Sequence, residues 1–243
     1  RCGSLTNVTI PNGVAYIGAR AFRYCTSLTS ITIPDSVTSI GECAFDGCSI
    51  TSITLPFIGA QKGGTENTHF GYIFGLNNNI EVPTSLKTVI ITGATTIGER
   101  AFSGCASLTS ITIPGSVTSI GDEAFRGCTS LTSVTIPNCV TTIGERAFYG
   151  CTSLTSIIIP DSVTSISDEA FSDCDSLESV TIPDNVTSIG YRAFINCTSL
   201  ESITMPNSAT FIGDEAFYGC SSLTSIIIPN SVTLSLIHIC RCR

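Results

Sequence analysis

The sequence of 243 residues contains no tryptophan, one methionine and two histidines, and only 12% of its residues are charged. Its formal net charge is -8 and its only lysines are Lys62 and Lys87, so it lacks the basic surface that nucleic acids and anionic membranes require. No apolar run approaches the roughly 18 residues of a membrane-spanning helix. The sequence therefore predicts no nucleic-acid partner and no membrane insertion, and a surface made largely of Ser, Thr and Asn.

The sequence also lacks the side-chain groupings that catalysis or metal binding requires. It contains no Ser/His/Asp arrangement, no phosphate-binding loop and no Cys-x-x-Cys pair within the repeats. Acidic pairs such as Asp122-Glu123 recur before an Ala-Phe dipeptide, but they occupy a repeated turn without a predicted pocket. We therefore expect no catalytic residue, no metal site, no cofactor and no enzymatic activity.

What the sequence does contain is one repeated unit, clearest at residues 28–49, LTSITIPDSVTSIGECAFDGCS. Similar copies begin at Leu5 and, from Leu108 to Leu223, every 23 residues. A period of this length predicts a solenoid, in which each unit packs only against its neighbours. We expect residues 1–233 to form a single repeat array that is stable only as an array.

Each unit has two halves with different patterns. The first half, such as residues 131–136, alternates with a period of two and is rich in β-branched residues, which predicts a short strand that Pro137 ends. The second half, such as residues 117–128, begins with an extended run and then places apolar residues four apart, including Ile120 and Ala124. This spacing predicts at most one turn of helix with these side chains directed inward.

The recurring string LxxIxIPxxVxxIGxxAFxxCxxL resembles the leucine-rich repeat of the BspA-like surface proteins over nearly the whole chain. The resemblance implies a right-handed leucine-rich repeat solenoid of the β-rich α/β repeat class. Its parallel β-sheet would have about ten strands, with short extended or one-turn helical segments on the opposite side. The resemblance also implies a cell-surface or secreted protein with a role in adhesion or in binding host or extracellular-matrix proteins.

Nine of the thirteen cysteines occupy one repeat position. Residues stacked at one position lie about 4.8 Å apart with parallel side chains, whereas disulfide-bonded Cβ atoms prefer about 3.8 Å and converging geometry. Cys43 and Cys139 stand outside this series. We expect the nine stacked cysteines to be free and buried and to act as small hydrophobic residues: Cys2, Cys25, Cys48, Cys105, Cys128, Cys151, Cys174, Cys197 and Cys220.

The array departs from its period at an insert, residues 57–84. The interval from Ile50 to the next copy is 36 residues instead of 23, and the usual second half is missing. Insertions in solenoids form loops, which often bind partners, so His69, Phe70 and Tyr72 are candidate binding residues. The alternative is that these aromatic residues fold inward to replace the missing core, since FGYIF alternates as a buried strand would.

The ends of the chain do not match complete units. Residues 1–5 match the middle of a unit and no initiator Met precedes them, so we expect a fragment that lacks its targeting and capping segments. Residues 234–243 match no repeat position and resemble the translated end of a sequencing-library transposon. We interpret this tail as an artefact of sequence assembly, the alternative being a degenerate last coil, and assign no metal or redox site to His238, Cys240 and Cys242.

The residues between the inward positions of each strand point outward and form two parallel files of hydroxyl side chains. Concave faces of solenoids bind extended partners, so we predict a non-enzymatic module that binds a protein, or a glycan, through the concave strand face. The alternative is a purely structural or ice- and water-ordering sheet, because hydroxyl groups that repeat about every 4.8 Å along each file could order water. The candidate partner-binding residues on this face are Ser110, Thr112, Ser133, Thr135, Ser156, Ser179, Thr181, Ser202 and Thr204.

Overall fold

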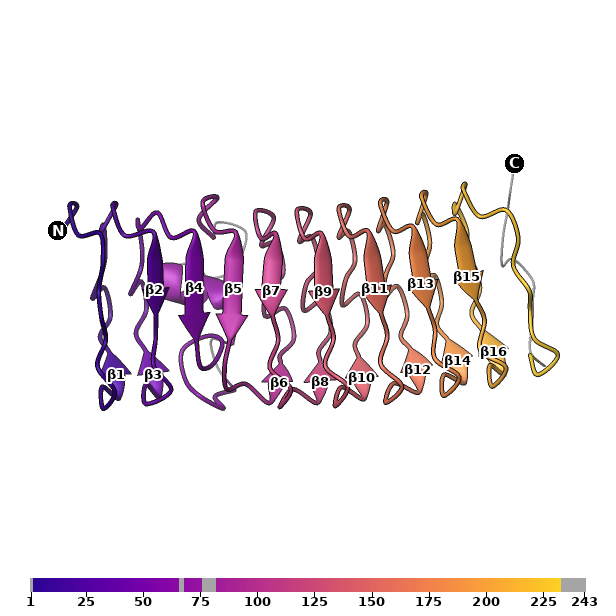
Figure 1. The fold of residues 1–243 in the computed structure, drawn as a ribbon, viewed down its shortest axis with the longest axis horizontal. Helices are drawn as coiled ribbons and strands as arrows, with labels where there is room; N and C mark the ends of the chain where they lie inside the picture. Colours follow the sequence, from indigo (N-terminus) through magenta and orange to yellow (C-terminus); the bar gives the residue numbers. More distant parts are fainter. Residues whose placement is uncertain (1, 66–67, 76–81, 233–243) are drawn as a thin grey trace.

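The computed structural model describes residues 2–65, 68–75 and 82–232, and these residues form an elongated solenoid of stacked coils (Figure 1). We call each repeat unit of the chain one coil. Residues 66–67 and 76–81 of the insert and the whole tail at 234–243 lie outside the described residues. None of the described residues belongs to a helix long and apolar enough to cross a membrane.

The main sheet has eight parallel strands, one from each of eight coils, with equivalent repeat positions side by side. The sequence predicted about ten strands. The first and last copies, at residues 5–10 and 223–228, pack against the core but have no strand pairing in the described chain. The eight strands are β2 (Ser30–Thr32), β4 (Ser52–Leu55), β5 (Thr88–Ile91), β7 (Ser110–Thr112), β9 (Ser133–Thr135), β11 (Ser156–Ile158), β13 (Ser179–Thr181) and β15 (Ser202–Thr204).

The predicted extended run in the second half of each unit is confirmed as a two-residue strand. These short strands form what we call the second sheet, which is divided into three parallel groups, β1-β3, β6-β8-β10 and β12-β14-β16. The strands are β1 (Tyr16–Ile17), β3 (Ser39–Ile40), β6 (Thr96–Ile97), β8 (Ser119–Ile120), β10 (Thr142–Ile143), β12 (Ser165–Ile166), β14 (Ser188–Ile189) and β16 (Phe211–Ile212).

The segment after each second-sheet strand is a series of turns, where the sequence suggested a turn of helix. Ala124 and Phe125 point inward and are fully buried, as predicted. However, Glu123 and Gly127 have φ angles of 53° and 71°, which lie outside the α-helical region. The amide of Phe125 donates to a carbonyl of the next coil at 2.8 Å. The one helix among the described residues is the 3₁₀ helix η1 (Phe70–Phe74), in the insert.

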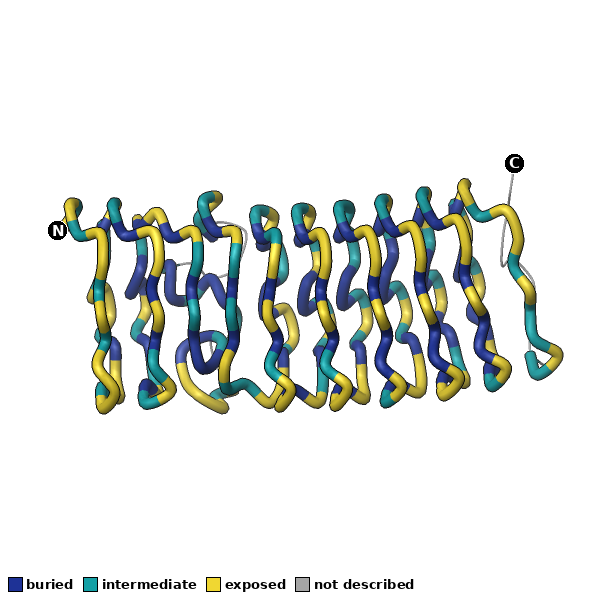
Figure 2. The backbone as a smooth tube through the Cα atoms, in the orientation of Figure 1, coloured by how far each residue is buried: buried dark blue, intermediate teal, exposed yellow. Residues whose placement is uncertain are grey.

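The core is a column of apolar side chains to which every coil adds one set, so buried segments recur along the whole array in Figure 2. A phenylalanine from each regular coil stacks on that of the next, with ring centroids 5.1 to 5.5 Å apart from Phe102 to Phe217. We call this series the phenylalanine file. Because each ring packs between the rings of the neighbouring coils, each coil depends on the coils beside it.

A file of buried, free cysteines runs beside the phenylalanine file, as the sequence predicted, although Cys2 is exposed. The thiol of Cys128 donates to the main-chain oxygen of Phe102 at 3.2 Å, and later cysteines repeat this bond. Burial raises the pKa of the Cys48 thiol to about 11 and that of Cys151 well above its usual range. These thiols are therefore protonated at neutral pH.

Glycine follows every second-sheet strand except β12, and between paired strands it lets neighbouring coils approach closely. A Cβ on Gly144 would lie 2.5 Å from the backbone nitrogen of Asp122. Residue 167 is a serine at this position, and β10 and β12 are not paired there. The amide of Gly144 donates to the carbonyl oxygen of Ile120 at 2.8 Å. At Ser167 the side-chain Oγ, not the amide, donates to the equivalent carbonyl oxygen, that of Ile143, at 2.5 Å. We attribute this break in the second sheet to the Cβ of Ser167.

Replacing Ser167 by glycine should close the break. We expect Ser167→Gly to stabilise the protein by about 1 kcal/mol, because recovered backbone hydrogen bonds outweigh the entropic cost of glycine. The melting temperature should rise by about 2–4 °C in thermal unfolding followed by circular dichroism. Gly144→Ala should lower it, since the added Cβ would meet the preceding coil. An unchanged or lower melting temperature for Ser167→Gly would show that the serine Cβ does not cause the break.

The cysteine file should resist alkylation in the native protein. Iodoacetamide should label the exposed Cys139 and leave Cys151 unlabelled, because the thiolate is the reactive form and burial suppresses both its formation and its exposure. Mass spectrometry of proteolytic peptides measures both sites in one sample, and denaturation before labelling should make them equal. Native labelling of Cys151 as fast as that of Cys139 would contradict the buried file.

Candidate binding surface

The outward residues of the main sheet form one surface, which we call the strand face. In β9 the pattern is exposed, buried, exposed, so Ser133 and Thr135 point outward while Val134 enters the core. The neighbouring strands repeat this pattern in register. The structure therefore brings together the predicted strand residues in two adjacent files: Ser110, Ser133, Ser156, Ser179 and Ser202 in one, and Thr112, Thr135, Thr181 and Thr204 in the other.

The hydroxyl groups of these two files make no hydrogen bond within the described part of the chain. Threonines elsewhere do. Thr132 and Thr155, just before β9 and β11, donate to carbonyl oxygens of the preceding coil at 3.4 and 3.3 Å, and Thr141 near the second sheet does the same at 3.3 Å. Side chains on the strand face stand away from the backbone and cannot reach those carbonyls. Their donors and acceptors are available to a partner.

A few residues interrupt the uniform strand face. Ile158 is 75% exposed and stands where most coils have threonine. Just before the strands, an exposed file holds Lys87 in one coil and Glu178 and Glu201 in two later coils. These residues make otherwise equivalent coils chemically different. Ile158 places an exposed apolar side chain on the face, and the charge beside the face changes from positive at Lys87 to negative at Glu178 and Glu201.

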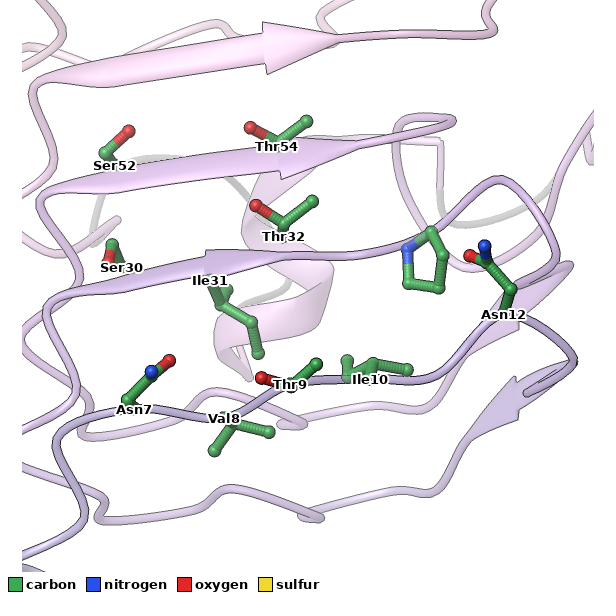
Figure 3. Close-up of a pocket in the computed structure, with 11 residues that line it drawn as sticks. Asn7, Val8, Thr9, Ile10, Asn12, Ser30, Ile31, Thr32, Ser52 and Thr54 are labelled. Carbon is green, nitrogen blue, oxygen red and sulfur yellow. The ribbon is translucent and has the colours of Figure 1, made fainter.

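The strand face is hollowed at its N-terminal end (Figure 3). A hollow of about 360 Å³ lies between the first coil and β2, where the first coil is not paired with the sheet. Asn7 and Thr9 occupy the positions equivalent to Ser30 and Thr32, and all four line the hollow. The repeat pattern gives no sign of this hollow, because it does not reveal that the first coil lacks a paired strand in the main sheet although its β1 pairs with β3.

The insert residues do not belong to the strand face. The 3₁₀ helix η1 replaces the missing turns and continues the core between neighbouring coils. Phe70 is fully buried, with its ring centroid 5.4 Å from that of Phe74 and 5.2 Å from that of Phe102. The prediction that Phe70 contacts a partner is therefore wrong, and the inward-folding alternative is correct for this residue. His69 and Tyr72 are half-buried and meet edge to face at 6.4 Å.

The recurring acidic residues on the turns pair with arginines. The hydrogen bond from Arg100 lowers the pKa of the Glu123 carboxyl. Such partly exposed pairs contribute little stability each. The neighbouring aspartates, Asp122 and Asp168, accept instead from backbone amides of the next coil, at 2.8 and 2.7 Å. Three of these ion pairs join one coil to the next: Arg100 to Glu123 at 3.0 Å, Arg146 to Glu169 at 2.7 Å and Arg192 to Glu215 at 2.6 Å.

Comparisons with known proteins agree with this architecture. The family model of the BspA-type leucine rich repeat region matches residues 1–89, 77–201 and 141–237, in six copies. A leucine-rich repeat protein from Bacteroides ovatus is 36% identical, with a TM-score of 0.61 over 90% of this chain and 48% of its own. This chain thus spans about half the length of that protein.

Two other solved structures are similar to this chain. A leucine-rich repeat protein from T. pallidum is 25% identical over 86% of this chain and 82% of its own, with a TM-score of 0.60. A protein from Faecalibacterium prausnitzii, described as a leucine rich cell surface protein, is 33% identical over 94% of this chain and 68% of its own, with a TM-score of 0.46. The comparison with curated proteins found no match.

Phe70 should be a structural residue of the insert. We expect Phe70→Ala to lower the free energy of unfolding by about 3–5 kcal/mol, because it leaves a cavity in the core beside Phe102. Tyr72→Ala, which truncates a half-buried neighbour, should cost clearly less. Urea denaturation of both variants measures the difference. Equal losses for the two variants would indicate that the Phe70 ring is not held in the core.

Proposed function

Because this chain belongs to the BspA-type leucine-rich repeat family, we propose that it is a binding module whose partner, a protein or a glycan, contacts the strand face. The observation that carries the proposal is the exposure and hydrogen bonding of the hydroxyl groups. Those of the strand face are exposed and have no hydrogen bond within the described residues, whereas threonines on other sides of the coil donate to the preceding coil. We further propose a cell-surface or secreted location, which the family resemblance supports.

The size of the strand face favours a particular kind of contact. Eight strands at about 4.8 Å spacing span roughly 34 Å, and three residues per strand span about 10 Å. This area is smaller than the roughly 800 Å² that each partner buries in a standard protein interface. We infer that a partner also covers the adjoining file with Glu178 and Glu201, or the hollow beside Asn7 and Thr9.

The composition of the face favours binding over the ordering of water alone. Regular hydroxyl files suit both functions. However, Ile158 is 75% exposed within the file and Ile227 is 83% exposed at the equivalent place of the last coil. Exposed isoleucines would interrupt a layer of ordered water, while a protein partner gains from burying them. A measurement of thermal hysteresis provides the direct test of the water-ordering alternative.

Charges placed on the strand face should abolish binding. We expect the triple variant Thr112→Glu, Thr135→Glu, Thr181→Glu to lose at least about tenfold in affinity for any ligand found in a screen of extracellular-matrix and cell-surface proteins and glycans. The physical reason is that a ligand would have to bury three unpaired carboxylates. Surface plasmon resonance with the immobilised ligand measures the change.

The matched control places the same three charges on the second sheet, as Ser119→Glu, Thr142→Glu and Ser165→Glu. These residues also point outward from consecutive coils, so this variant should bind like the unmodified protein. Circular dichroism should show that both variants are folded. Unchanged binding by the strand-face variant would reject this face, and loss confined to the control would place the interface on the second sheet.

A further inference from the structure

The insert leaves a gap in the second sheet. On one side of the gap the insert replaces the missing strand, because residues 60–62 lie antiparallel to β3. The amide of Ile40 donates to Ala60 at 2.9 Å, and that of Lys62 donates to Thr38 at 3.0 Å. On the other side, β6 starts a new group of parallel strands with no strand before it in the described chain. A hollow of about 360 Å³ separates the two sides.

Two backbone amides, one on either side of β6 in the sequence, face this hollow. In the next coil, the amides of Thr118 and Gly121 donate to Thr95 and Ile97 at 2.9 and 2.8 Å. The coils of β10, β14 and β16 repeat both bonds. The equivalent donors in the coil of β6 are the amides of Thr95 and Gly98. Both residues line the hollow, and neither amide has an acceptor among the described residues.

The surroundings of the glycine in this coil agree with the absence of a strand beside β6 among the described residues. A Cβ on Gly121 would lie 2.8 Å from the nitrogen of Glu99. A Cβ on Gly98 would meet only the Thr68 Cβ, at 4.0 Å. Gly98 thus has room that the glycines of the later coils do not have, so the described part of the chain leaves the gap open where a neighbouring strand normally lies.

The chemistry of the gap specifies its occupant. Two amides on one edge of an extended strand require two carbonyl oxygens at the matching spacing, which an extended peptide supplies. Ile58, which is half-buried, lines the hollow beside the buried Phe57 and provides an apolar contact for a side chain of such a peptide. Lys62 also lines it, and is one of only two lysines in a chain of net charge -8. Its ammonium group favours a peptide with a carboxylate.

We propose that this gap, between residues 57–64 and 93–98, binds one extended segment of a partner protein that carries an Asp or Glu side chain. The segment adds a strand to the free edge of β6, so its main-chain carbonyls accept from Thr95 and Gly98 and its carboxylate pairs with Lys62. This site is separate from the strand face and does not depend on the function proposed for that face.

Hydrogen exchange of the unmodified protein provides the first test. In the free protein the amides of Thr95 and Gly98 should exchange at least about tenfold faster than those of Thr118 and Gly121, which are bonded to the preceding coil. Protection of Gly98 in dilute free protein would mean that the chain fills its own gap. Protection that appears only as the protein concentration rises would mean that a second copy fills it. Either result would overturn the proposal.

A phage-displayed library of short linear peptides provides the probe. We expect it to yield acidic peptides that slow the exchange of the Thr95 and Gly98 amides when added as synthetic peptides. Gly98→Val places a side chain in the gap and should reduce their affinity at least about tenfold, measured by isothermal titration calorimetry. Lys62→Glu should also weaken them, whereas Lys87→Glu, at the other lysine, should not.

Two controls separate this site from others. Thr142→Val adds an apolar side chain to the exposed second sheet outside the gap and should leave peptide affinity unchanged. The triple strand-face variant should also bind these peptides normally, so failure of one proposal is distinguishable from failure of the other. Recovery of no acidic peptide, or of peptides that neither protect Gly98 nor respond to Lys62→Glu, would overturn the proposal, even if Gly98→Val did not fold.

Discussion

Contact between one coil and the next is the interaction on which the rest of the structure depends. Phe148 is covered by the rings of Phe125 and Phe171, at 5.1 and 5.4 Å, and no residue of its own coil could cover it in this way. The backbone obeys the same constraint, because Gly144 lies so close to the preceding coil that it has no room for a side chain. The sequence of each unit is therefore constrained by packing against its neighbour. An irregular unit must cover the core and the backbone of the neighbouring coils with different residues.

This constraint explains what the sequence could predict. Inward and outward positions recur with the period, so the strands, the buried cysteines and the two hydroxyl files were all predictable. The turn at Glu123 was not, because its positive φ has no signal in a residue that usually favours helix. The role of Phe70 was open because it depends on Phe102, in the next coil. The hollows at the first coil and at β6 depend on pairings that are missing, which no local pattern records.

The insert shows that the two sheets differ in how they accommodate additional residues. The main sheet continues across it, since β4 and β5 pair over four residues each despite the longer connection between them. The described residues of the insert lie in the second half of the coil, where η1 replaces the turns and residues 60–62 form hydrogen bonds with β3. Residues 60–62 pair with β3, and no segment among the described residues pairs with β6 on that side. The free edge of β6 is the consequence, and the strand face remains uninterrupted.

A repeated surface also raises a problem of register. If every coil offered the same two hydroxyl groups, a partner shifted by one coil would make nearly the same hydrogen bonds, and binding would not define a position. The exceptions remove this degeneracy. Ile158 marks one coil by an apolar side chain, while Lys87 and Glu178 mark two others by opposite charges. In the binding mode that we propose, the regular residues of the strand face supply contact area, and these irregular residues determine where along the array the partner binds.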